Sequence, residues 1–418
     1  MNKKHTKNVN RTLYEKLCTG CGTCSGVCPN DAISIVKGKK GEGYVPKINS
    51  DKCTNCGLCL KSCPGISVDF KKLSLLIAGG EKKNNLIENY LQCYAGYTTN
   101  KKLRYDCSSG GVVTQLLLFL LENKMITGAL VTKMKKNNPL ESESFIAKTK
   151  EQIISAKGSK YCPNPINIML KKIHGLGDHE KIAIVGLPCH IQGIRKAQEK
   201  LPILKKKIFI CIGLFCSHTP NSKSTKIFIN KKMKICDQDI QKLSYRGSGW
   251  PGYMEILKTN EKCSKISLSN YWRFLGSSAF ALSRCKLCVD ATAELADISC
   301  GDAWLPEFSK NNTGMSVIIA RNHNTKKIID LMDKTKSLHL KKISIDKIIQ
   351  SQISILNYKK IIIPWKIRFR KLFNRNNPLY NIELPSPGFK KSFKIFRHKI
   401  ISLIYEFLHL IRVILKKF

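Results

Sequence analysis

The residues in this chain best suited to chemistry are cysteines, and eight of them form a repeat near the N-terminus. The segments LCTGCGTCSGVCP and KCTNCGLCLKSCP share the spacing C-x2-C-x2-C-x3-C-P, and equivalent cysteines, such as Cys18 and Cys53, are 35 positions apart. This spacing is typical of bacterial ferredoxins that hold two [4Fe–4S] clusters. The predicted ligands are Cys18, Cys21, Cys24, Cys28, Cys53, Cys56, Cys59 and Cys63.

The same spacing predicts how these cysteines are shared between the two clusters. Three closely spaced thiolates surround one cluster, while the fourth, which follows a turn, ligates the other cluster. The first predicted quartet is therefore Cys18, Cys21, Cys24 and Cys63. The second is Cys53, Cys56, Cys59 and Cys28. Two structural zinc sites are the alternative, but such sites prefer two separated C-x2–4-C pairs.

Four later cysteines could converge on a third cluster. Cys189 and Cys216 follow apolar segments that we expect to be buried strands, and Cys285 and Cys288 form a C-x2-C pair. The alternative is that this pair binds zinc. Burial as a small apolar side chain fits other cysteines better, including Cys211, Cys236 and Cys263.

Residues from about Leu91 to Arg321 resemble the coenzyme F420 hydrogenase/dehydrogenase beta-subunit family of iron–sulfur flavoproteins, which also includes 7-hydroxymethyl chlorophyll a reductase. The matching segments are SSGGVVTQLLLFLLE, KGSKYCPNP, VGLPCHIQGIRK, GLFC and CKLCVDATAELADISCGDAW. The chain resembles the longer members, which carry a fused ferredoxin. The resemblance implies FAD in the core domain beside a [4Fe–4S] cluster. The ligands that it implies for this third cluster are Cys189, Cys216, Cys285 and Cys288.

Two Gly- and Ser-containing segments are the candidate flavin contacts. Ser108 to Gly111 open a predicted helix, where free N–H groups and hydroxyls can receive a pyrophosphate. Lys160 could neutralise phosphate charge. Helix capping is the alternative for the serines, and Asp302 is either a flavin or substrate contact or a turn residue. The candidates are Ser108, Ser109, Gly110, Gly111, Gly158, Ser159, Lys160, Tyr161 and Asp302.

A flavin together with [4Fe–4S] clusters defines a class of reaction. A flavin accepts a hydride as two electrons and can release them singly to clusters. We expect electron exchange between these clusters and a hydride donor or reducible substrate; no catalytic residue can be identified. The alternative is a non-catalytic electron-transfer subunit that feeds a partner enzyme. The resemblance alone implies a link to polysaccharide biosynthesis.

Composition and charge limit the classes of partner that we expect. The 418 residues include 19 cysteines, and 72 Lys and Arg against 29 Asp and Glu give a net charge of +43. The N-terminus has no apolar signal segment, so we expect reduced thiols in the cytoplasm. The lysines do not cluster with aromatic residues in a recognisable motif, which makes nucleic acid an unexpected partner. The expected partners are an electron donor or acceptor protein or a small hydride carrier.

The C-terminal residues 389–418 form a basic, amphipathic pattern. The polar positions Ser402, Glu406 and His409 recur at helical spacing and leave a wide Ile, Leu and Phe face. Such a helix could lie on the anionic inner face of the cell membrane, and packing on this protein or a partner is the alternative.

The fold class expected from these features is α+β. A ferredoxin module is fused to a mixed α/β flavin-binding core, and an amphipathic helix follows. We expect no further cofactor chemistry after about Leu331. The predicted divisions are a ferredoxin domain (1–72), a linker (73–90), N- and C-terminal parts of the core (91–170 and 171–330), a basic extension (331–388) and the amphipathic helix (389–418).

Overall fold

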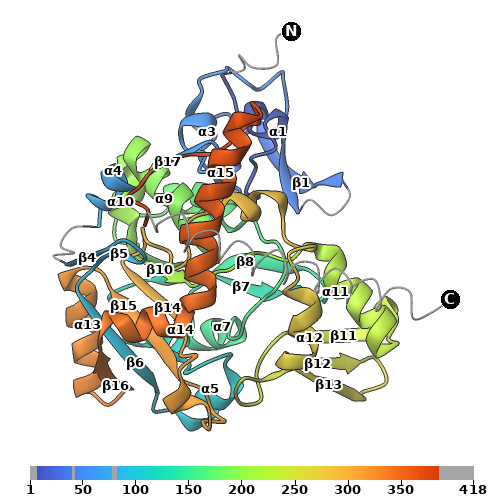
Figure 1. The fold of residues 1–418 in the computed structure, drawn as a ribbon, viewed down its shortest axis with the longest axis vertical. Coiled ribbons are helices and arrows are strands. Elements are labelled where there is room, and N and C mark those ends of the chain that lie inside the picture. The colour runs from blue at the N-terminus through green and yellow to red at the C-terminus, as the bar shows by residue number, and fades with distance from the viewer. Residues whose placement is uncertain (1–6, 40–42, 78–81, 386–418) are drawn as a thin grey trace.

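The computed structural model describes residues 7–39, 43–77 and 82–385 (Figure 1). A cysteine-rich N-terminal module lies against a mixed eight-stranded sheet with helices on both faces, and a smaller antiparallel sheet lies to one side. The predicted α+β class with an N-terminal ferredoxin module and a mixed α/β core is confirmed. The predicted helix 389–418 lies outside the described residues.

The central sheet has the strand order β16-β6-β15-β14-β10-β9-β7-β8. Its four middle strands, β14, β10, β9 and β7, run parallel, and the other strands pair antiparallel to their neighbours. The carboxyl ends of the parallel strands meet at one edge, where open α/β sheets bind ligands. The strands are β6 (Gln92–Thr98), β7 (Gly128–Met134), β8 (Ser142–Ala147), β9 (Ile182–Gly186), β10 (Ile208–Leu214), β14 (Ile298–Asp302), β15 (Ser316–Ala320) and β16 (Leu338–Ile343).

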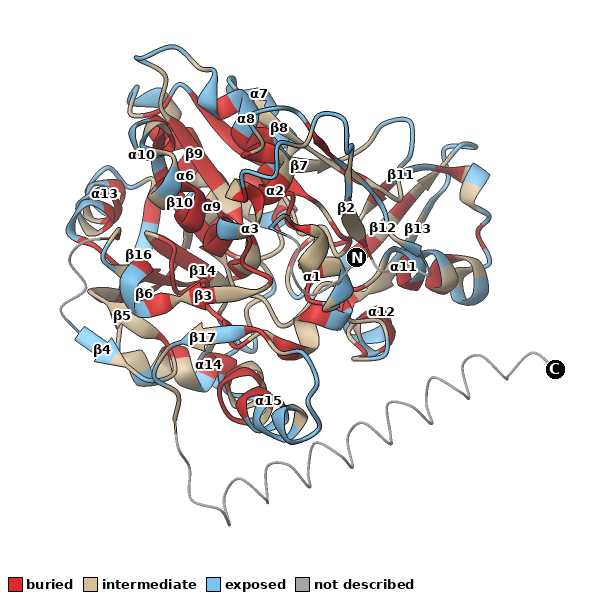
Figure 2. Ribbon diagram, turned by 90° about the horizontal axis from the view of Figure 1, so that it is seen from above, coloured by how far each residue is buried: buried red, intermediate tan, exposed pale blue. Residues whose placement is uncertain are grey.

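Both faces of this sheet are buried, which is why the parallel strands are almost wholly apolar (Figure 2). One face packs against α6 (Val112–Glu122) and α13 (His323–Lys334). The other packs against a second set of helices. These are α8 (Leu170–His174), α9 (Pro188–Lys200), α10 (Pro202–Lys207), α14 (Ile345–Asn357) and α15 (Ile363–Leu372). Two short helices, α5 (Lys101–Asp106) and α7 (Lys150–Ser155), connect the strands.

The N-terminal module packs tightly onto the core. Its Leu17 and Val27 share one apolar cluster with Leu170 of α8. A Cβ on Gly26 would lie 2.0 Å from the carbonyl oxygen of Asn167, so this position has no room for a side chain. The module contains α1 (Asn10–Tyr14), α2 (Thr23–Gly26), β1 (Ile33–Lys37), β2 (Tyr44–Ile48), α3 (Leu58–Lys61), β3 (Ser67–Asp69) and α4 (Phe70–Ser74).

The chain after Leu331 is part of this architecture. β16 pairs with β6 in the central sheet, and β17 (Leu379–Asn381) pairs with β3 in the N-terminal module. The segment between α14 and α15, Tyr358–Ile362, forms a π-helix that buries Lys359 and Lys360. The predicted domain boundaries stay predictions, but the extension contributes to both parts of the molecule.

A three-stranded antiparallel sheet and a hairpin complete the described chain. β11 (Ile240–Ser244), β12 (Tyr253–Lys258) and β13 (Cys263–Ser267) pack with α11 (Ser222–Phe228) and α12 (Leu268–Leu275). In the predicted linker, β4 (Lys82–Asn84) and β5 (Glu88–Tyr90) form the hairpin, with Ile87 fully buried between them.

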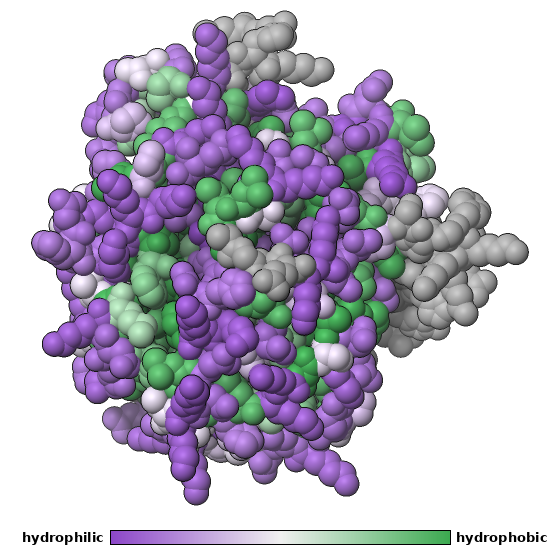
Figure 3. All heavy atoms as spheres, turned by 90° about the vertical axis from the view of Figure 1, so that its left-hand side faces the viewer, coloured by the Kyte–Doolittle hydropathy of each residue, from purple (hydrophilic) through white to green (hydrophobic). Residues whose placement is uncertain are grey.

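Hydrophilic side chains dominate the face shown in Figure 3, and apolar residues are confined to small patches on it. Within the described ranges, no helix is both long and apolar enough to cross a membrane.

Candidate redox site

The structure brings the first predicted quartet together. Cys18, Cys21, Cys24 and Cys63 line one small cavity in the N-terminal module. Burial raises the pKa of Cys18 to about 12, and the nearby thiol of Cys63 adds to this shift. Gly20 and Gly22 have positive φ angles of 71° and 84°, which let the backbone turn tightly between the thiols. Four neighbouring thiols facing one cavity are a donor set suited to a [4Fe–4S] cluster.

The second quartet lies nearer the surface. Burial raises the pKa of Cys59 to about 11, with further contributions from Cys28 and Cys56. Cys28 therefore lies with the second set of thiols, as the ferredoxin spacing predicts. Cys53 and Cys56 occupy the same loop, and Cys56 is exposed. The thiol of Cys59 also raises the pKa of Cys24, so the two quartets are neighbours.

The four predicted ligands of the core also converge. Cys189 lies in the first turn of α9 after β9, and Cys216 follows β10. The pKa of Cys189 is raised well above its ordinary value by burial and then by four thiols, which are Cys21, Cys285, Cys216 and Cys288. No group of three or more His, Cys, Asp or Glu side chains in the described residues is close enough to hold a single metal ion. Ligation of a third cluster by these thiols stays a prediction.

Cys21, which raises the pKa of Cys189, belongs to the first quartet. The first and third quartets are therefore neighbours. Two buried cations fix this junction. Arg284 donates from Nε to the carbonyl oxygen of Gly65 at 3.2 Å, and Lys196 donates from Nζ to that of Cys63 at 2.8 Å. The N-terminal module is thereby joined to the core next to both sets of thiols.

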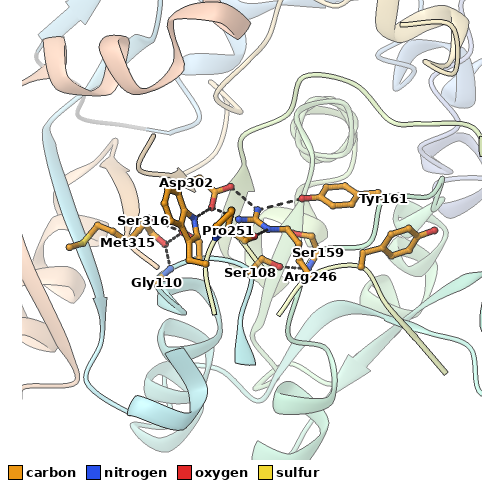
Figure 4. Close-up of polar contacts among 12 residues, drawn as sticks. Ser108, Gly110, Ser159, Tyr161, Arg246, Pro251, Asp302, Met315 and Ser316 are labelled. Atoms are coloured by element: carbon orange, nitrogen blue, oxygen red, sulfur yellow. Dashed lines mark hydrogen bonds and ion pairs between the residues drawn. The ribbon is translucent and has the colours of Figure 1, made fainter. Parts of the chain in front are cut away.

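The predicted flavin contacts also come together, at the carboxyl edge of the sheet (Figure 4). The Oγ of Ser108 accepts a hydrogen bond from the backbone N–H of Ser159 at 2.7 Å. The N–H of Gly110 donates to the Oγ of Ser316 at 3.0 Å, and a Cβ on Gly110 would lie 2.5 Å from the carbonyl oxygen of Gly96. The loop before α6 is thus held against both the 158–161 segment and the sheet.

The hydroxyl of Ser109 and the backbone of Gly111 are also engaged in this loop. Ser109 Oγ donates to the carbonyl oxygen of Met315 at 2.8 Å. Gly111 precedes α6 with φ of 73°, a conformation that favours glycine. Gly158 likewise has a positive φ, of 83°. Neither serine caps α6, because Gly111 is the N-cap and no side chain bonds to the first turn. The serines instead hold the loop against neighbouring segments, and its binding of a pyrophosphate stays a prediction.

Asp302 lies at the end of β14 and is engaged by two residues that the sequence analysis missed. Arg246 binds its carboxylate with both terminal nitrogens, at 2.8 and 3.0 Å, and Trp250 donates from Nε1 at 3.1 Å. The side chains of Arg246 and Asp302 are 3% and 18% exposed. Arg246 also donates to the hydroxyl of Tyr161 at 3.4 Å. Asp302 is therefore held in place by this bidentate ion pair.

Lys160 is bonded to backbone carbonyl groups in this structure. Its ammonium donates to the backbone carbonyls of Ala156, Lys157 and Gly158, the last two at 2.9 Å. Burial lowers its pKa to about 8. In this structure Lys160 stabilises the end of α7, and its contact with a phosphate stays a prediction.

A cavity of about 500 Å³ opens beside these residues. Met315, whose carbonyl accepts from Ser109, lines it, and so does Asn312, whose carbonyl accepts from the N–H of Trp250 at 2.7 Å. Its lining contains basic side chains and no acidic one. The lining residues are Ala95, Tyr97, Arg104, Phe308, Asn311, Asn312, Thr313, Met315, His339 and Lys341.

Comparison with known families identifies the two parts of this arrangement. Residues 93–171 match the N-terminal model, and residues 179–346 the C-terminal model, of the coenzyme F420 hydrogenase/dehydrogenase beta subunit. Together the two matches span more than half of the chain. The chain belongs to this family. Residues 17–65 match the 4Fe-4S dicluster domain, which confirms the predicted ferredoxin domain with its iron–sulfur clusters.

Individual members of the F420 hydrogenase/dehydrogenase family share about a quarter of their residues with the chain. The coenzyme F420 hydrogenase subunit beta of Methanothermobacter thermautotrophicus is 27% identical over 56% of this chain and 82% of its own length. The coenzyme F420-dependent sulfite reductase of Methanocaldococcus jannaschii is 27% identical over 84% of this chain, but the match spans only 51% of that protein.

A solved structure shows a related fold. One chain of the xenon-derivatised F420-reducing [NiFe] hydrogenase complex from Methanosarcina barkeri superimposes with a TM-score of 0.56 and 22% identity. The superposition covers 72% of this chain and 99% of that chain. At this level of identity the likeness supports the fold alone.

Proposed function

We propose that this family member is an iron–sulfur flavoprotein oxidoreductase. It exchanges electrons between its [4Fe–4S] clusters and a hydride donor or reducible substrate bound at FAD. The observation that carries this proposal is the serial arrangement of the thiols. Cys59 of the second quartet neighbours Cys24 of the first, and Cys21 of the first neighbours Cys189 of the third.

The third quartet and the candidate flavin residues share the carboxyl edge of the sheet. Leu214, two residues before Cys216, pairs with Cys300, two residues before Asp302. A carrier bound near Asp302 would therefore lie close to the third quartet. FAD bound there would supply the conversion of a hydride into two single electrons.

The residues of this chain would bind and orient the two reactants. Ser108 to Gly111 and Gly158 to Tyr161 would hold the flavin, and Arg246 would fix Asp302 beside it. The cavity beside this site has cationic side chains from Arg104 and Lys341 and aromatic side chains from Tyr97 and Phe308 in its lining. It would admit an anionic hydride carrier, either a deazaflavin, as the names of the relatives indicate, or a pyridine nucleotide.

The relatives named as subunits indicate a protein partner for this chain as well. We propose that the second quartet exchanges electrons with that partner, since its Cys56 lies at the surface. If the isolated protein oxidised no hydride carrier, the chain would be a non-catalytic electron-transfer subunit. A place in polysaccharide biosynthesis rests on the resemblance alone.

The function is tested by adding reduced coenzyme F420, NADH or NADPH to the anaerobically purified chain and following flavin and cluster absorbance. We expect bound flavin and bleaching of the clusters with at least one carrier. In Gly110→Ala, the added methyl group cannot fit beside Gly96. It should therefore lower the free energy of unfolding by about 1–3 kcal/mol and reduce flavin binding.

Gly175→Ala is the matched control. Gly175 has an ordinary φ of −85°, and the atoms nearest to an added Cβ are 3.8 and 3.9 Å away. This variant should keep wild-type flavin content and lie within about 1 kcal/mol of wild-type stability. A wild-type protein that holds no flavin and reacts with none of the carriers would rule out the proposed enzyme.

We also propose that residues 389–418 contact an anionic membrane surface, because their sequence combines basic residues with an apolar face. Removal of the chain from Pro387 onward should move the protein from the membrane pellet to the supernatant after cell fractionation. An unchanged distribution would rule out this contact.

A further inference from the structure

Lys359 lies against the third quartet, in a part of the chain for which the sequence predicted no role in cofactor chemistry. Its Nζ is 3.7 Å from the Sγ of Cys288 and donates to the carbonyl oxygen of Asp290 at 2.6 Å. The residue is 1% exposed. An ammonium group is therefore held beside a predicted cluster ligand and away from water.

The neighbouring residue, Lys360, is also a buried lysine, but its charge is balanced in a different way. Lys360 forms an ion pair with Glu294 at 2.6 Å, and both side chains are fully buried. The contacts of Lys359 are instead a thiol sulfur and a backbone carbonyl. Both lysines lie in the π-helix at Tyr358–Ile362, and π-helical turns occur frequently at functional sites.

We propose that Lys359 is the counter-charge of the third cluster and raises its reduction potential. The inference rests on the proposed ligation of that cluster by Cys189, Cys216, Cys285 and Cys288. Reduction adds one electron, so the cluster and its thiolates gain one negative charge without forming a bond or taking up a proton. The fixed ammonium of Lys359 attracts this added charge and stabilises the reduced state, because net charge and contacts to the sulfurs set cluster potentials.

Other charges around the third quartet define what Lys359 contributes. Arg284 is buried nearby, but its guanidinium also faces the first quartet through Pro64 and Gly65. The carboxylate of Asp290 accepts from Gln192 Nε2 at 2.9 Å and from the N–H of Glu294. Among the described residues, Lys359 is thus the cation with a direct contact to a sulfur of the third quartet, and its removal should affect this cluster more than the other two.

An EPR-monitored redox titration of the anaerobically purified full chain tests this inference. The signal of the third cluster is identified as the one missing from Cys216→Ala. In Lys359→Met, we expect the ratio of reduced to oxidised third cluster at the wild-type midpoint to fall at least about tenfold, a shift of about 59 mV for one electron. The ferredoxin clusters should shift much less.

Two variants provide the controls. Lys359→Arg retains the charge and should keep a potential close to that of the wild type. Lys371→Met removes an exposed lysine from the neighbouring α15 and should leave all three clusters unchanged. An unshifted third cluster in Lys359→Met, with wild-type iron content, would overturn the role of Lys359.

Loss of the third cluster from Lys359→Met would be resolved with Lys359→Gln. Loss of the third cluster from both neutral variants but not from Lys359→Arg supports a requirement for positive charge at this position. Loss of the cluster from all three variants shows that the shape of the lysine side chain, and not its charge, is required. A wild-type protein that lacks the third cluster would instead refute the proposed function itself.

Discussion

The Cys189→Ala variant is expected to lose about four of about twelve irons per chain, because one of three four-iron clusters can no longer form. It should also lose electron transfer between a hydride carrier and the ferredoxin clusters. Cys189 is the thiol through which the third quartet neighbours the first, so its loss would break the path between the proposed flavin site and the ferredoxin clusters. Iron analysis and anaerobic stopped-flow absorbance measure the two effects.

Cys211→Ala is the control for this variant. Cys211 is fully buried on β10, the strand that Cys216 follows, but it packs in the apolar core. Its replacement should therefore leave iron content and electron transfer at wild-type levels. If Cys189→Ala kept all its iron and transferred electrons normally, the assignment of the third quartet would be wrong.

The Arg246→Leu variant is expected to lower the free energy of unfolding by about 3–5 kcal/mol. Removal of one partner of a buried ion pair leaves the other charge uncompensated. In this case the carboxylate of Asp302 would retain only the hydrogen bond from Trp250. The change is measured as a shift in the urea midpoint of the purified protein.

Flavin content should fall in parallel, because Arg246 joins Tyr161 to Asp302. The double variant Arg246→Leu, Asp302→Leu removes both charges and should recover part of the stability without restoring flavin. A loss of less than about 1 kcal/mol in the single variant would show that the pair behaves like an exposed one.

The ferredoxin module could be predicted from the sequence because its ligands are local. Three cysteines within seven residues and a proline after the fourth are visible without knowledge of the fold. The grouping of Cys28 with Cys59, and of Cys63 with Cys18, agrees with that spacing. Convergence of the core thiols could be anticipated because Cys189 and Cys216 each follow an apolar strand, whereas the full ligand set was implied by the family resemblance.

Long-range partners could not be predicted in the same way. Arg246 lies in the loop YRGSGWPGY, and the glycines and tryptophan of this loop are the only local signal of a role. Its partner Asp302 is far away in the sequence, at the end of β14. Lys359 is one of 72 Lys and Arg residues, and nothing near it in the sequence marks it as buried. The pairing of β17 with β3 joins segments from opposite parts of the chain.

The most direct test of three thiol quartets arranged in series is the content of iron, sulfide, zinc and flavin in the anaerobically purified wild-type chain. The proposed function predicts about twelve irons, about twelve sulfides and one flavin per chain, without stoichiometric zinc. If the protein contained about eight irons and no flavin, it would be a ferredoxin module fused to a core without a cofactor. Zinc in place of iron would contradict the account entirely.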